Sequence, residues 1–72
     1  MTQADRILEF LLEWGTITPY QAFEQLGITK LSTRISEMRA AGVKIKKEMV
    51  SDVNRYGDPV RYCRYSLEEE NA

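Results

Sequence analysis

The sequence has 72 residues with 10 Lys and Arg against 11 Asp and Glu, so its net charge is −1, and it contains no histidine. A chain of this length forms one domain with a small core. Its single cysteine, Cys63, cannot make an internal disulfide or a cysteine-based metal site. Without histidine as a general base and without a glycine-rich phosphate loop, we expect no enzymatic activity, no cofactor and no bound metal.

Targeting signals are also missing from the sequence. No stretch approaches the ~20 consecutive apolar residues that a membrane span requires. The chain does not open with a basic segment followed by an apolar one, as a signal peptide does. We therefore expect a cytoplasmic protein with no membrane partner.

The charges are segregated along the chain. Residues 1–28 carry a net charge of −3, residues 29–64 carry +5, and residues 65–72 carry −3. The middle segment is therefore the candidate contact surface for an anionic partner, although mixed charges also simply solvate a small domain.

Three helices are expected in the first 41 residues. The first spans residues 4–14, with Thr2 or Gln3 near its start, a broad apolar face and Gly15 as its stop. A short extended piece, 16–17, follows. Thr18 caps a second helix whose first residue is Pro19 and which ends at Gly27. Thr29 is expected to cap a third helix that reaches residue 41, before Gly42.

The third helix has two distinct faces. Leu31, Ile35 and Met38 recur at helical spacing, which predicts that they face the core. The opposite face is small and hydroxylated, with Lys and Arg at its edges. Arg34 is expected to pair with Glu37 one turn later rather than to contact a partner.

After Gly42 the pattern changes to strand alternation. Residues 43–53 predict one strand, with an irregularity near Lys47 and Glu48. Residues 54–59 hold the Asn, Gly, Asp and Pro of a turn, and residues 60–67 predict a second strand. Tyr65 is expected in the core, Cys63 is expected to be a buried small residue, and Tyr62 half exposed.

This order of elements predicts an α+β fold, a winged helix-turn-helix with a three-helix core followed by a β-hairpin wing. The domain is expected to span residues 1–67, with residues 68–72 as an acidic, disordered tail.

The sequence resembles the small winged helix-turn-helix domains often encoded by bacteriophages. The resemblance runs from about Ile7 to Leu67, and it includes the stretches 17–19 (Ile-Thr-Pro), 34–35 (Arg-Ile), 38–39 (Met-Arg) and 61–65 (Arg-Tyr-Cys-Arg-Tyr). It implies a DNA-binding module, such as a phage or prophage transcriptional regulator or an excisionase-like architectural protein.

Double-stranded DNA requires a helix in the major groove and cations on the phosphates. On the third helix the candidates for base contacts are Lys30, Ser32, Thr33 and Ser36, and Arg39 is a candidate for a phosphate contact. On the hairpin, Arg55 and Tyr56 at the tip are candidates for a minor-groove or backbone contact, and the strand candidates for phosphate contacts are Lys46, Arg61 and Arg64.

Other partners stay open. A monomer of this size reads few base pairs, so a homodimer is one expectation, with the acidic first helix and its Phe10 and Trp14 as the contact. The net charge of −1 also suits a winged helix that binds protein, such as a phage inhibitor of a host or defence protein. An RNA-binding protein would need an exposed aromatic pair on a sheet, which the sequence does not predict.

Overall fold

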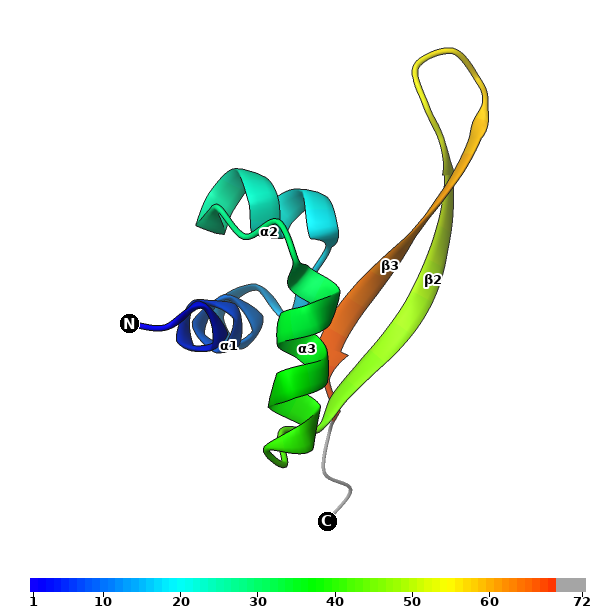
Figure 1. Cartoon of the computed structure of the whole chain (residues 1–72). Coiled ribbons are helices and arrows are strands. Elements are labelled where there is room, and N and C mark those ends of the chain that lie inside the picture. The colour runs from blue at the N-terminus through cyan, green and yellow to red at the C-terminus, as the bar shows by residue number, and fades with distance from the viewer. Residues whose placement is uncertain (69–72) are drawn as a thin grey trace.

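Residues 1–68, which the computed structural model describes, form three helices followed by a long β-hairpin that projects beyond them (Figure 1). In chain order the elements are α1 (Gln3–Trp14), β1 (Thr16–Ile17), α2 (Pro19–Leu26), α3 (Leu31–Ala40), β2 (Ile45–Val53) and β3 (Pro59–Leu67). The expected three helices and hairpin are therefore confirmed, each within a few residues of its expected ends.

Two capping boxes begin the first two helices. The Thr2 hydroxyl accepts from the Asp5 backbone N–H at 3.1 Å, and the Asp5 carboxylate accepts from the Thr2 N–H at 3.0 Å. These bonds from Thr2 hold the pKa of Asp5 below its usual value. Thr18 and Gln21 make the same reciprocal pair at 3.2 and 3.0 Å, ahead of a proline in the first turn of α2.

The start of α3 differs from the expectation. Its N-cap residue is Lys30 and not Thr29, and no side-chain capping bond is present there within residues 1–68. The expected Thr29 cap is therefore wrong. Ile28 and Leu31 on either side are both buried, so the packing of these two side chains decides where the chain enters the helix.

The three strands form an antiparallel sheet in the order β1-β3-β2. The hairpin register runs unbroken from Ile45 opposite Leu67 to Val53 opposite Pro59, so the expected irregularity near residues 47 and 48 is wrong. On the other side of β3, Ile17 lies opposite Tyr65. The central strand is β3, and β1 and β2 are the two edge strands.

The core lies where the helices meet the base of the hairpin. It holds ten buried apolar residues: Ile7, Leu11, Ile17, Ala22, Ile28, Leu31, Ile35, Met38, Ile45 and Tyr65. The expected core positions of α3 and of Tyr65 are thus confirmed. Cys63 is half-buried rather than buried, because it lies one pair of positions beyond Tyr65 towards the wing tip, where helix cover ends. Its thiol donates to Tyr65 Oη at 3.4 Å.

The wing beyond the core is held by strand pairing and by its turn. Asn54 Oδ1 accepts from the backbone N–H groups of Tyr56 and Asp58 at 2.9 and 3.0 Å, and Gly57 takes φ 81°. At the other end, the Glu68 N–H donates to Lys44 O at 3.0 Å, so the expected tail is anchored at its first residue. Residues 69–72 of that tail lie outside the described part.

No helix within residues 1–68 has the length and apolar character needed to cross a bilayer.

Candidate nucleic-acid interface

The outer face of α3 is exposed and small. Ser32, Thr33 and Ser36 are all exposed, on the side of the helix opposite the buried Leu31, Ile35 and Met38. Lys30 is also exposed, at the N-terminal end of this face. The face therefore offers hydroxyl donors and acceptors with little bulk, as a helix needs in order to approach base edges.

Arg34 is drawn into a local ion pair. Its Nη1 lies 3.0 Å from Glu37 Oε1, one turn along α3. This confirms the expected pairing. Because Glu37 balances its charge, Arg34 does not count as a free cation on the helix.

Arg39 joins α3 to the wing. Its Nε and Nη2 both donate to the carbonyl oxygen of Ile45, at 3.0 and 2.8 Å. Because Ile45 is the first residue of β2, this fork fixes the end of α3 against the start of the hairpin. No pattern in the sequence predicts this bond, since it depends on how the chain returns after Gly42. The remaining guanidinium N–H groups are available for a phosphate.

The wing tip is open to solvent. Tyr56 is 78% exposed, and the Arg55 guanidinium carbon lies 5.7 Å from the centre of the Tyr56 ring. The two side chains form one cationic, aromatic projection at the far end of the hairpin.

The cations along the wing strands divide between its two faces. Side chains alternate in a strand, and the register places Lys46 and Arg64 on one face and Arg61 on the other. Lys47, on the same face as Arg61, was not among the expected contacts. Lys47 was missed because an irregularity was expected at residues 47 and 48. Regular strand alternation would have placed Lys47 on this face.

Arg64 is neutralised by its cross-strand neighbour. Glu48 lies directly opposite it, and the Glu48 carboxylate accepts from Arg64 Nε at 2.7 Å and from its Nη2. Within residues 1–68, four of the six cations expected to contact DNA make no ion pair or hydrogen bond to a protein acceptor: Lys30, Lys46, Arg55 and Arg61.

A hollow of about 540 Å³ lies between the start of α2 and β3. Thr18, Pro19, Tyr20, Gln21 and Tyr62 line it. Tyr62 is half-buried, as expected, and it brings the wing close to the capped N-terminus of α2. The nearby Glu24 carboxylate raises the pKa of Tyr20, because it favours the neutral hydroxyl.

No group of three or more possible metal ligands occurs among residues 1–68. The arrangement of an exposed helix face beside a basic hairpin is one that contacts a surface.

A comparison of the sequence with known protein families gives the same fold as the order of helices and strands. A family model described as a winged helix-turn-helix domain matches residues 2–70, which is nearly the whole chain. No curated protein and no solved structure matches this chain. Winged helix-turn-helix domains are a class of fold used to bind DNA. On this match and on its architecture, the chain belongs to the winged helix-turn-helix domain family.

Proposed function

We propose that this protein is a non-enzymatic, cytoplasmic DNA-binding module, a small phage or prophage transcriptional regulator or an excisionase-like protein. α3 enters the major groove and the wing lies on the backbone or in the minor groove. The observation that carries the proposal is the outer face of α3, whose exposed Ser32, Thr33 and Ser36 have Lys30 at one end and the wing beside them.

The residues divide by role. The α3 hydroxyls and Lys30 reach base edges, which carry the sequence information. Arg39 holds α3 against β2 and gives its free N–H groups to a phosphate. Arg55 and Tyr56 enter the minor groove or lie along the backbone at the wing tip. The phosphate contacts of the strands come from Lys46, Arg61 and Arg64.

A protein-binding winged helix is the alternative function. The net charge of −1 and the Glu48–Arg64 pair favour it, because a DNA-binding surface gains from unpaired cations. The partner would then be a host or defence protein that meets the same helix and wing.

Fluorescence anisotropy of labelled duplex DNA across a range of salt tests the proposal. We expect binding that weakens steeply with salt, and a further loss in Lys30→Ala and Arg55→Ala. Gln3→Glu is the matched control, because it also lowers the net charge by one but at an exposed site at the start of α1. Absence of binding at low salt would refute the proposal and leave the protein-binding alternative.

A further inference from the structure

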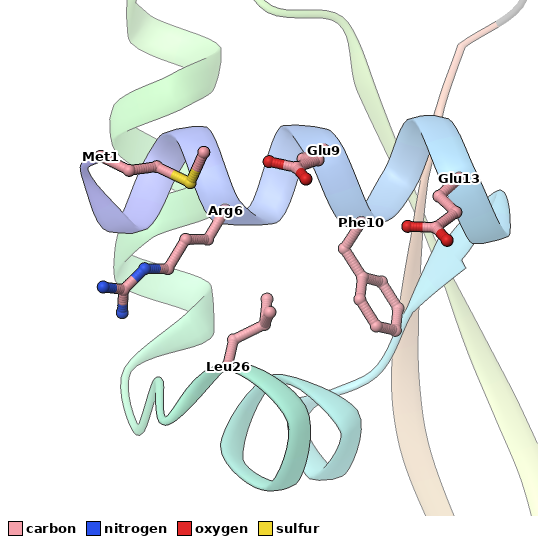
Figure 2. A pocket seen from close by; sticks show the side chains of 6 residues that line it. All are labelled: Met1, Arg6, Glu9, Phe10, Glu13 and Leu26. Atoms are coloured by element: carbon pink, nitrogen blue, oxygen red, sulfur yellow. The ribbon is translucent and has the colours of Figure 1, made fainter.

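A second surface lies between α1 and the end of α2. It shares no residue with the outer face of α3 or with the wing. Figure 2 shows a groove there, with the Phe10 ring pointing from α1 towards α2 and the Leu26 side chain pointing from α2 towards α1. Its volume is about 180 Å³, and its lining residues are Met1, Arg6, Glu9, Phe10, Glu13 and Leu26.

Large exposed apolar side chains lie on the same two helices. Trp14 is 68% exposed and its ring centre lies 6.3 Å from that of Phe10, one turn earlier on α1. Phe23 on α2 is 61% exposed. Aromatic side chains clustered in this way on a small domain mark a contact surface, since exposed aromatic area is costly in water.

Two of the three charges along the groove are placed for self-pairing. Arg6 lies four residues before Phe10 and Glu13 lies three residues after it, so the two charges stand at opposite ends of the groove (Figure 2). If a second α1 packs antiparallel across a two-fold axis between Glu9 and Phe10, each Arg6 meets the Glu13 of the other copy. Glu9, which also lines the groove, then lies beside the axis, next to the Phe10 of the other copy. A parallel arrangement would place like charges together, and a wholly basic peptide would leave Arg6 facing a cation.

We propose that two copies of this chain form an antiparallel dimer through α1, with the two Phe10 side chains at its centre, an Arg6–Glu13 ion pair towards each end, and Trp14 beyond each Glu13. Such an interface is isologous, as in most dimers. Dimer formation itself does not require DNA. Its use rests on the proposed function, because two α3 helices related by a two-fold axis would read an inverted repeat.

Sedimentation equilibrium of the full chain without DNA tests the dimer. We expect the apparent mass to rise with concentration from 8.4 kDa towards twice that value. Arg6→Glu and Glu13→Arg should each shift the protein to monomer, and the double variant R6E/E13R should restore the dimer. Both reversals suit the α1 dipole, since they place an anion nearer its N-terminus and a cation in its last turn, so the helix is preserved.

Trp14→Ser should also weaken the dimer. Leu12→Ser is its matched control, since Leu12 is 70% exposed on α1 and does not line the groove, whereas the Trp14 ring packs against Phe10, which does. A monomer at every concentration, or a dimer that both charge reversals leave intact, would overturn the inference. Low-salt binding of the monomeric variants to duplex DNA reports the proposed function separately, because each copy keeps its own α3 and wing.

Discussion

Replacing Glu48 by Gln should strengthen DNA binding, because it releases Arg64 from its cross-strand ion pair. The carboxylate that holds Arg64 becomes a neutral amide of the same shape, and the guanidinium becomes available to a phosphate. The fold should survive, since the two side chains are 40% and 46% exposed and a pair this open to water contributes less than about 1 kcal/mol.

The size of the effect follows from the number of cations. Each phosphate that is neutralised adds ~0.9 to the slope of log affinity against log salt. Four of the cations proposed to meet the DNA backbone make no ion pair within residues 1–68: Arg39, Lys46, Arg55 and Arg61. With these four the slope should be about −3.6, and with Arg64 released it should be about −4.5. Between about 50 mM and about 200 mM salt, the variant should therefore lose roughly threefold more affinity than the parent.

Anisotropy titrations of one duplex at several salt concentrations give both slopes. The matched control is Gln3→Lys, which raises the net charge by the same amount at the start of α1, away from the wing. If the Glu48→Gln slope equals that of the parent, or if Gln3→Lys steepens the slope equally, then Arg64 does not meet a phosphate and the wing face that carries it does not lie against DNA.

Three further predictions concern stability. Ile35→Ala should lower the free energy of unfolding by about 2–4 kcal/mol in urea melts, because the side chain is 2% exposed in the core; Ser36→Ala, on the exposed face next to it, should change it by less than about 0.5 kcal/mol. Thr18→Ala should lower the free energy of unfolding by about 1 kcal/mol, since it removes the side-chain cap of α2. The variant should unfold at lower urea, and an unchanged midpoint would show that the capping box does not contribute to stability. Burial raises the pKa of Tyr65 from 10.0 to about 12, so the unfolded chain ionises first and stability should fall by at most about 3 kcal/mol as the pH rises from about 10 to about 12. Urea melts across this range should show a shallower fall in Tyr65→Phe, and an equal fall would show that Tyr65 is not the group responsible.

The local features of this fold are readable from the sequence because they depend on neighbours in the chain. Thr18 followed by Pro19 starts a helix for reasons that lie within one turn, and Leu31, Ile35 and Met38 repeat with the helical period. The Arg34–Glu37 pair is of the same kind, three residues apart.

The features that sequence reasoning missed depend on distant residues. The entry into α3 is set by burial of Ile28 and Leu31, which overrides the preference of Thr29 for a cap. The partner of Arg64 depends on the hairpin register, which pairs residues sixteen positions apart. The roles of the DNA-facing side chains remain predictions, because they depend on a partner and not on the chain alone.

The pairing of β1 with β3 has a consequence for how this protein unfolds. Thr16 and Ile17 bond to Ser66 and Tyr65, so the segment between α1 and α2 and the last strand complete each other across about fifty residues of chain. Amide hydrogens at this junction should exchange with solvent only on global opening, whereas those near the wing tip should exchange by local fraying. The helices without the hairpin would lack the core residues Ile45 and Tyr65, so residues 1–42 alone should not fold. Because the contacts between β1 and β3 join distant parts of the chain, the whole domain should fold in milliseconds rather than microseconds.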